Sequence, residues 1–356
     1  MHGVLPSQVL RKLVRDGMIS GPEAAPVEAG QVQPASLDLR LGTEALRLRA
    51  SFLPGPGQAV RDRFADMVMH RMSLEGGAVL EKGCVYLVPL LERVTLPEGV
   101  SGAANAKSST GRLDIMTRLI ADGGIEFDRI PAGYDGPIYA EICPRSFSVL
   151  ARPGMRLNQL RLWSGRHLLD DGELSAWHAG DPLTSGEPDI RDGLGFSVDL
   201  SEGQVIGYRA RAHTGVIDLD RIGHYPRTAF WDPLHAEKGQ LILDPGAFYI
   251  LASREALRIP PGLAAEMAPY LAMIGEFRVH YAGFFDPGFG HAAASGSGAR
   301  GVLEVRCHEA PFAIEHGQTV GRLLFERMAD IPDILYGTSI ASNYQGQGLK
   351  LSKHFT

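Results

Sequence analysis

Cysteine is scarce in this chain of 356 residues, and the scarcity excludes two kinds of site. The three cysteines, Cys84, Cys143 and Cys307, are too few and too scattered for a disulfide framework or for four thiolate ligands around a metal. The 12 histidines show no metal-ligand spacing either. We therefore expect reduced, mostly buried thiols in a cytoplasmic protein, and no zinc site.

The chain also lacks a long apolar run and an excess of positive charge. No apolar stretch is long enough to span a bilayer, and the first residues do not follow the basic, apolar and small-residue order of a secretory signal. A formal net charge of -6 argues against a broad surface for nucleic acid or acidic lipid, although a local basic pocket remains possible. We expect neither a nucleic-acid polymer nor a membrane among its partners.

Glycine and proline, by contrast, are abundant, and the sequence repeats itself. The 43 glycines and 23 prolines separate short apolar runs, which is typical of many short strands joined by tight turns. Residues 79–86 reappear in similar form as residues 242–249, and other segments recur at the same shift. We predict a mainly β protein of two similar sandwich or barrel domains, spanning residues 1–165 and 191–356, with a polar connector at 166–190.

Few helices are expected. Residues 6–17 fit a helix with Ser7 as its N-cap and Gly17 as its stop. A second helix could be capped by Asp62, and a third could occupy residues 168–178.

A cluster of basic and hydroxyl side chains lies in the first copy, at Lys107-Ser108-Ser109-Thr110-Gly111-Arg112. Ammonium, guanidinium, hydroxyl and backbone N–H groups together suit an oligophosphate, although a solvated polar turn has the same composition. The matching stretch of the second copy, residues 270–275, has neither the serines nor the arginine.

Acidic residues mark a second candidate site. Glu141 and Glu304 occupy the same position of the repeat, each in a short apolar strand. Such an acid either faces water or lies in a pocket, where desolvation suits it to proton transfer. Asp286 begins an Asp-Pro-Gly turn in the second copy, whereas the first copy has Pro131 at that place.

The carboxyl end is polar, aromatic and rich in glycine, with Tyr336 followed by residues 342–348. It could be a frayed tail or an arm that folds over a bound ligand.

Together these segments resemble the dCTP deaminase family, the deaminating branch of the dUTPase-like fold. The resemblance rests on residues 36–42, 106–112, 285–289, 302–304 and 336–347. It implies two tandem dUTPase-like domains, of the β-clip or distorted jelly-roll type, with few short helices.

The resemblance also implies a reaction, the hydrolytic deamination of dCTP to dUTP and ammonia without zinc. Glu304 would be the general acid and base, with Glu141 in the same position of the first copy. Ser108 and Arg112 would orient the water and the glutamate. Substrate contacts would come from Lys107, Ser109, Ala121, Asp286, Tyr336 and Gln347. Magnesium (Mg²⁺) would be held mainly by the triphosphate and not by protein ligands.

Departures from the family pattern predict a mixed site. The first copy lacks the aspartate and the second lacks the serines, so we expect phosphate contacts from copy one and sugar and base chemistry from copy two. Asn343 stands where the family usually has a lysine. Because the family is trimeric by domain, a homo-oligomer of three two-domain chains is favoured, with a dimer also possible.

Two other functions stay open. A dUTP pyrophosphatase, or a bifunctional dCTP deaminase and dUTPase that releases dUMP, would use the same residues. A nucleotide-binding regulatory protein would retain binding without turnover.

Overall fold

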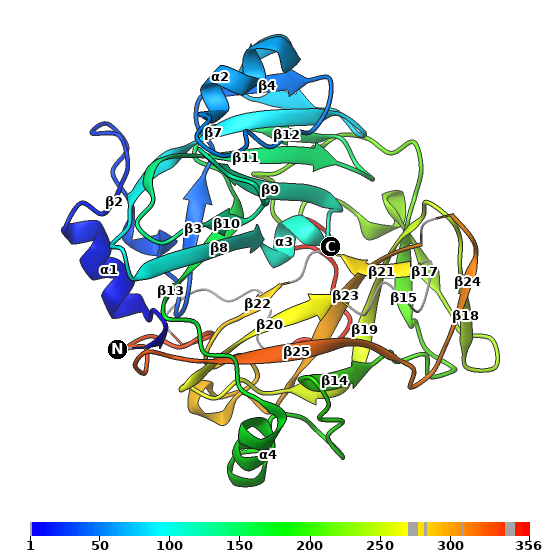
Figure 1. The fold of residues 1–356 in the computed structure, drawn as a ribbon. Helices are drawn as coiled ribbons and strands as arrows, with labels where there is room; N and C mark the ends of the chain where they lie inside the picture. The colour runs from blue at the N-terminus through cyan, green and yellow to red at the C-terminus, as the bar shows by residue number, and fades with distance from the viewer. Residues whose placement is uncertain (1, 270–276, 281–282, 308, 339–345) are drawn as a thin grey trace. The chain divides into compact units, whose positions relative to one another are not determined.

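The chain forms two compact units. The computed structural model describes residues 2–269, 277–280, 283–307, 309–338 and 346–356. Unit 1 comprises Met1–Arg166 together with Gly215–Ile222, and unit 2 comprises His167–Thr214 and Gly223–Thr356. Both are built mainly of strands, which confirms the mainly β architecture expected (Figure 1).

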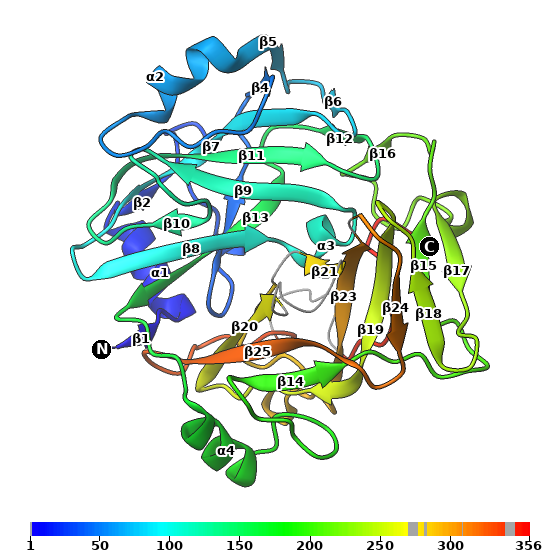
Figure 2. The same cartoon turned by 45° about the vertical axis from the view of Figure 1, so that its right-hand side comes forward.

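Unit 1 contains two larger sheets and one small sheet. The first sheet has the order β1 (Gly3–Val4), β13 (Arg156–Ser164), β8 (Val100–Ala106) and β10 (Arg129–Ile130), with β3 (Leu37–Arg40) also paired to β13. The second has the order β5 (Val68–Ser73), β4 (Glu44–Leu48), β7 (Val85–Thr95), β11 (Asp135–Pro144) and β9 (Ile115–Ala121), with β2 (Ile19–Ser20) also on β7. The small sheet joins β16 (Ile217–Asp218), β12 (Val149–Ala151) and β6 (Ala78–Leu80), which are seen together in Figure 2.

Unit 2 repeats this strand order. One sheet runs β14 (Leu194–Ser197), β25 (Thr319–Arg327), β20 (Leu263–Pro269) and β22 (Phe284–Phe285). The other runs β17 (Trp231–Leu234), β15 (Gly207–Ala210), β19 (Phe248–Leu257), β23 (Ala299–Cys307) and β21 (Phe277–His280), beside the pair β18 (Gln240–Leu243) and β24 (Phe312–Glu315). The internal duplication read from the sequence is therefore a duplication of topology.

Each strand that carries a repeated glutamate lies between two neighbours. β11 pairs with β7 and β9, and β23 pairs with β19 and β21. Apolar side chains cover both strands, so β11 is buried over nearly its whole length and β23 likewise. A glutamate in the middle of either strand is consequently buried. The alternative that these glutamates face water is therefore wrong for both Glu141 and Glu304.

The few helices are short, and two of the expected caps are corrected. Helix α1 (Ser7–Arg15) has Pro6 as its N-cap, with no side-chain cap, so Ser7 is the first helical residue; Gly17 follows the helix with a left-handed φ of 74°, as expected for a stop. Helix α2 (Val60–Phe64) begins before Asp62, and it is Asp122 Oδ1 that accepts the Val60 N–H, at 2.7 Å.

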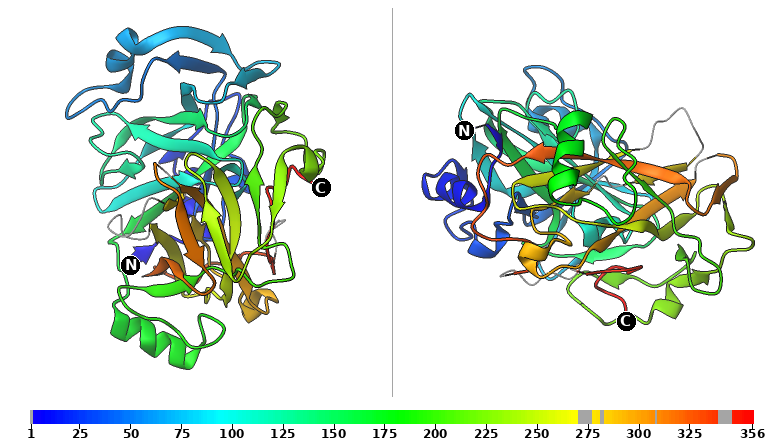
Figure 3. Two further views of the ribbon diagram at one scale, coloured as in Figure 1. Left: turned by 90° about the vertical axis from the view of Figure 1, so that its right-hand side faces the viewer. Right: turned by 90° about the horizontal axis from the view of Figure 1, so that it is seen from below.

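The third expected helix is α4 (Asp171–Gly180), the green helix of Figure 3. Its N-cap is a capping box, in which Asp170 accepts from the Glu173 N–H and Glu173 accepts from the Asp170 N–H. Arg327, at the end of β25, pairs with the same Glu173 at 2.9 Å. The remaining short helical turns are α3 (Ser108–Gly111), η1 (Ala29–Gln31), η2 (Ala65–Met67), η3 (Arg227–Ala229) and η4 (Ala292–Ala294).

Candidate functional site

The basic and hydroxyl cluster of the first copy forms a single helical turn directly after β8. Lys107 is the N-cap of α3, and its carbonyl accepts the N–H groups of Thr110 and Gly111 at 2.8 and 3.0 Å. The Lys107 N–H donates to Leu157 on β13 at 2.9 Å, which fixes the turn to the sheet. Ser108 is exposed, whereas Arg112 is buried. The turn therefore combines an exposed serine with a buried arginine.

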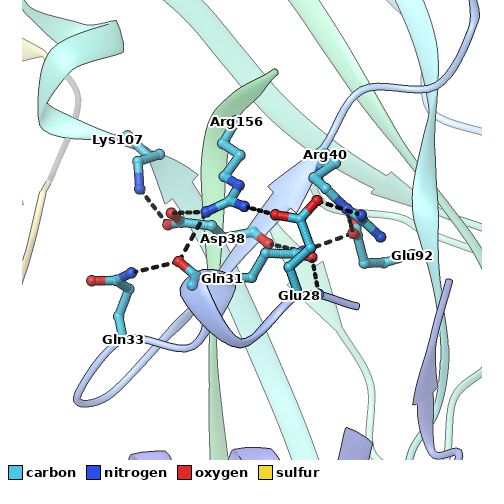
Figure 4. Close-up of polar contacts among 9 residues, drawn as sticks. Glu28, Gln31, Gln33, Asp38, Arg40, Glu92, Lys107 and Arg156 are labelled. Atoms are coloured by element: carbon cyan, nitrogen blue, oxygen red, sulfur yellow. Dashed lines mark hydrogen bonds and ion pairs between the residues drawn. The ribbon is translucent and has the colours of Figure 1, made fainter. Parts of the chain in front are cut away.

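A network of charged side chains lies behind this turn (Figure 4). The Lys107 ammonium pairs with Asp38 on β3, and Arg156 on β13 lies 3.9 Å from the other oxygen of Asp38. Arg156 also pairs with Glu28 and donates to the Gly30 carbonyl at 2.8 Å. Asp38 is almost fully buried, so its charge needs these partners. Lys107, expected to meet phosphate, is thus already held by a carboxylate.

The network continues into the core of unit 1. Arg40 Nε donates to Glu92 at 2.7 Å, and the Arg40 backbone N–H donates to the other oxygen at 2.8 Å. Gln31 Nε2 bridges the Glu92 carboxylate and the Asp38 carbonyl, at 2.8 Å to each. Because both Arg40 and Glu92 are buried, removing either partner would leave an uncompensated charge.

The structure gives the glutamate of unit 1 a basic partner. Arg118 on β9 stands opposite Glu141 in the register of the sheet, and its guanidinium pairs with Glu141 Oε1, with Nε at 3.0 Å. The same guanidinium donates to Ser51 Oγ at 2.8 Å and lies 3.6 Å from the ring centroid of Phe127. Ala121 ends the same strand, and its carbonyl accepts the Gly124 N–H at 3.1 Å.

A further carboxyl group lies close to this ion pair. Burial raises the pKa of Asp128 to about 7, and the charge of Glu141 also raises it. A hydrogen bond from the Leu119 N–H and the charges of Arg118 and Arg129 lower it, but by less. The Leu119 N–H to Asp128 Oδ1 distance is 2.7 Å. Burial is therefore the dominant influence on the pKa of this carboxyl group.

In unit 2 the equivalent glutamate has different neighbours. Glu304 stands opposite Ile250 of β19 and His280 of β21, and 7% of its surface is exposed. Like Asp286, Tyr336 and Gln347, Glu304 interacts with other residues of the chain.

Asp286 begins a tight turn, as its sequence predicts. The Phe289 N–H donates to the Asp286 carbonyl at 3.1 Å, and Gly288 has a φ of 96°, the geometry of a type II turn. The Asp286 side chain is buried, so it is not simply a surface turn residue. The Tyr336 N–H donates to Pro287 at 2.8 Å, which joins the start of the tail to this turn.

The described part of the tail is fixed and not frayed. The ring of Tyr336 packs on Phe289, with centroids 5.6 Å apart. Residues 346–356 follow the undescribed stretch that contains Asn343, and Gln347 is hydrogen-bonded to Arg300 on β23. The last residues pair with residues 223–225, where Thr356 N–H donates to Tyr225 at 2.9 Å.

No close group of three or more His, Cys, Asp or Glu side chains occurs within the described ranges. The three cysteines are free thiols, of which Cys143 and Cys307 are buried. In the same ranges no helix is long and apolar enough to cross a membrane.

Sequence reasoning missed the residues that surround the predicted ones, chiefly Asp38, Arg40, Glu92, Arg118 and Asp128. The alternation at residues 36–41 suggests a half-exposed strand, yet Asp38 and Arg40 are both buried. The repeat alone did not point to Arg118, because the residue 163 positions later is Tyr281, whereas the strand pairing sets His280 across from Glu304.

Comparison with known proteins places these features in context. Residues 1–166 match the family model of the 2′-deoxycytidine 5′-triphosphate deaminase N-terminal domain, and residues 170–355 match that of its C-terminal domain. A curated protein of Haloarcula marismortui named dCTP deaminase is 33% identical over 156 residues, which are 43% of this chain and 76% of that protein. One of Sulfurihydrogenibium sp., named "dCTP deaminase, dUMP-forming", is 29% identical over 163 residues, 44% of this chain and 81% of that protein.

A solved structure is similar over nearly the whole chain. The crystal structure of 2′-deoxycytidine 5′-triphosphate deaminase from Agrobacterium tumefaciens is 51% identical in sequence and superposes with a TM-score of 0.88. The match covers 92% of this chain and 99% of that one. Both units therefore have counterparts in a single related chain.

Proposed function

Because the chain belongs to the dCTP deaminase family, we propose that it hydrolyses the exocyclic C4–N bond of dCTP, giving dUTP and ammonia, with Glu304 as general acid and base. The observation that carries this proposal is the position of Glu304, a nearly buried carboxylate in the middle of β23. Because β23 is paired on both sides, by β19 and β21, the backbone of Glu304 is held in place. Its side chain has little contact with bulk water.

In the proposed reaction, Glu304 takes a proton from the water that attacks C4 of the cytosine ring. The C4–N bond then breaks as that proton is delivered to the departing amino group. The hydroxyl proton of the intermediate ends on N3 of the ring, so that ammonia leaves and the new oxygen becomes the uracil carbonyl. General acid–base transfer of this kind contributes about 10²–10⁴-fold to rate. No zinc-bound hydroxide is needed for this route.

The other predicted residues take supporting roles in the proposal. Ser108 and Arg112 orient the water and the glutamate, and the Ala121 carbonyl helps hold that water. Lys107 and Ser109 meet phosphates, and Asp286 reads the sugar hydroxyl. The buried position of Arg112 and Asp286 favours these roles, because buried polar groups are held in one orientation. That residues of both copies serve one site stays a prediction.

Mg²⁺ enters the proposal with the substrate. The described residues provide no cluster of acidic or histidine ligands, whereas a triphosphate supplies several hard oxygen ligands to this ion. We therefore propose that the ion arrives bound to the triphosphate and water, and that it neutralises phosphate charge.

Chromatography of the products formed from dCTP, with and without Mg²⁺, tests the function. The expected products are dUTP and ammonia, and Glu304→Gln is expected to lower the rate at least 100-fold. Glu315→Gln is the matched control, since Glu315 is an exposed glutamate on β24 of the same unit. Binding of dCTP without any ammonia release would instead favour a regulatory protein.

A second candidate is a bifunctional enzyme that releases dUMP. The relative from Sulfurihydrogenibium sp. that is named dUMP-forming favours it. In that case the same assay would yield dUMP and pyrophosphate in place of dUTP, and added dUTP would be consumed.

We also propose a homo-oligomer, with three chains favoured over two. Light scattering coupled to size-exclusion chromatography measures the mass directly, and a multiple of the 38.5 kDa chain is expected.

A further inference from the structure

The two repeated glutamates occupy equivalent backbone positions, and on one side they stand opposite different residues of the neighbouring strand. Glu141 lies opposite Leu87 on one side, as Glu304 lies opposite Ile250, 163 positions later in each case. On the other side, Glu141 faces Arg118 and Glu304 faces His280. The duplication therefore provides an internal comparison in which the residue across from the glutamate differs between the two copies.

In unit 1 this position is filled by a cation. Arg118 directs two N–H groups at Oε1 of Glu141, and none of the Glu141 side chain is exposed. Oε2 is buried as well and accepts no hydrogen bond from the described residues. A general base must lie within hydrogen-bond reach of the water that it deprotonates. The Arg118 guanidinium therefore occupies Oε1, and burial separates the whole Glu141 side chain from bulk water.

The arginine is itself fixed by other side chains of unit 1. Phe127 lies under its guanidinium at 3.6 Å, and Ser51 accepts a hydrogen bond from it at 2.8 Å. Asp128 follows Phe127, and its backbone carbonyl accepts the Ala104 N–H. In unit 2 the equivalent carbonyl belongs to Gly283, which accepts the Met267 N–H and brings no side chain. Copy one thus has both the arginine and a second carboxyl group beside it, and Gly283 brings no carboxyl group at the matching place in copy two.

We propose that Arg118 closes the glutamate position of unit 1, so that Glu141 is a structural partner of the arginine and Glu304 is the acid–base residue of the chain. The inference rests on the proposed function. It means one working glutamate per chain in spite of the duplication. It also gives Glu141 a role without catalysis, because loss of the carboxylate would leave the half-buried Arg118 guanidinium without its charged partner.

Paired substitutions separate this structural role from catalysis. Glu141→Gln is expected to lower the melting temperature by roughly 5 °C or more while ammonia release from dCTP stays within about threefold of the unsubstituted enzyme. The double variant Arg118→Met with Glu141→Leu replaces the ion pair by apolar groups, and it is expected to regain most of the lost stability and to remain active. Glu304→Gln should show the reverse pattern, with a melting temperature close to that of the parent and a loss of at least 100-fold in rate.

The outcomes are distinguishable. A parent enzyme that releases no ammonia would defeat the proposed function itself. An active parent with an inactive but folded Arg118→Met, Glu141→Leu variant would overturn the inference, because Glu141 would then be needed for chemistry. Equal melting temperatures for Glu141→Gln and the parent would also overturn it. If Glu141→Gln misfolds, the double variant still tests the inference, because its fold does not depend on the ion pair.

Discussion

Gln347 and Arg300 are joined by two hydrogen bonds that attach the tail to β23. The Arg300 N–H donates to the Gln347 carbonyl at 2.9 Å, and Gln347 Nε2 donates to the Arg300 carbonyl at 3.0 Å. Arg300 is on the same strand as Glu304, and its guanidinium pairs with Asp199. The end of the chain and the proposed acid–base residue thus share one strand.

The first prediction concerns Gln347→Ala. The substitution removes the side-chain hydrogen bond and keeps the backbone one, so the melting temperature should fall by no more than about 2 °C. If Gln347 covers the phosphates, KM for dCTP should rise roughly 3- to 10-fold with kcat little changed.

Gln318→Ala is the matched control for this experiment. Gln318 also makes one side-chain hydrogen bond to a backbone group, accepting the Glu315 N–H at 3.1 Å in the turn between β24 and β25. Its substitution should leave KM unchanged. Equal KM values for both variants would argue against a substrate contact by Gln347.

The second prediction separates the ring of Tyr336 from its hydroxyl group. The ring packs on Phe289, which in turn lies 5.2 Å from Phe285, so Tyr336→Phe should keep the melting temperature. Loss of the hydroxyl should raise KM for dCTP several-fold if it binds phosphate. Tyr336→Ala should add a drop of several degrees, because it removes the aromatic packing as well. A Phe variant with the parent's KM would show that the residue serves packing only.

The fold could be predicted from the sequence because its signals are local and repeated. Strands β8 and β20, and likewise β13 and β25, begin and end at positions related by the repeat. The Asp-Pro-Gly turn at residue 286 follows from the conformations of proline and glycine alone. Patterns of this kind need no knowledge of which strands become neighbours.

The environment of the site could not be predicted in the same way. Whether Asp38 and Arg40 are exposed or buried depends on what covers β3. The charges that compensate them come from Glu92, Lys107 and Arg156, far along the chain. The N-cap prediction for α2 was wrong for a related reason. The backbone N–H at the start of α2 is satisfied by Asp122, which is distant in sequence, and not by the nearby Asp62.

The third prediction is a pH dependence that originates at Asp128. Its pKa in the folded protein, about 7, lies above the ordinary value of 3.8, so the folded state binds more protons than the unfolded state between these values. Stability should therefore fall as pH rises from about 4 to about 7. Asp128→Asn should flatten this dependence and make the protein more stable than the parent at pH 8, by on the order of 2 kcal/mol.

Asparagine is the informative replacement at this position. Its side-chain oxygen can still accept the Leu119 N–H, and asparagine tolerates the left-handed φ of 62° found there. Thermal unfolding from pH 4 to pH 8 measures the effect, with the exposed Asp66→Asn as the control. Parallel stability curves for Asp128→Asn and the parent would contradict the prediction.

The last prediction concerns the segment at residues 215–222, which belongs to unit 1 although copy two surrounds it in sequence. Strand β16 pairs in parallel with β12, and Arg152 binds both oxygens of Asp218, with Nη1 at 2.6 Å and Nη2 at 3.0 Å. The hydrogen bond to Arg152 is the main cause that lowers the pKa of Asp218 below 3.8. Asp218→Asn should lower the melting temperature by about 2–4 °C at pH 7 and expose the segment to proteolysis.

The sign of the pH effect and a close control make this prediction specific. Since the pKa of Asp218 is lowered by folding, its contribution is complete above pH 4 and is lost as pH falls further, so the difference between variant and parent should shrink toward pH 3. Asp220 also binds Arg152, at 2.8 Å, but 59% of its side chain is exposed. Asp220→Asn should therefore change the melting temperature by less than about 1 °C, because exposed ion pairs contribute little. If both variants lowered the melting temperature equally, the negative charge of the segment would matter, and the two-oxygen contact of Asp218 with Arg152 would have no special role.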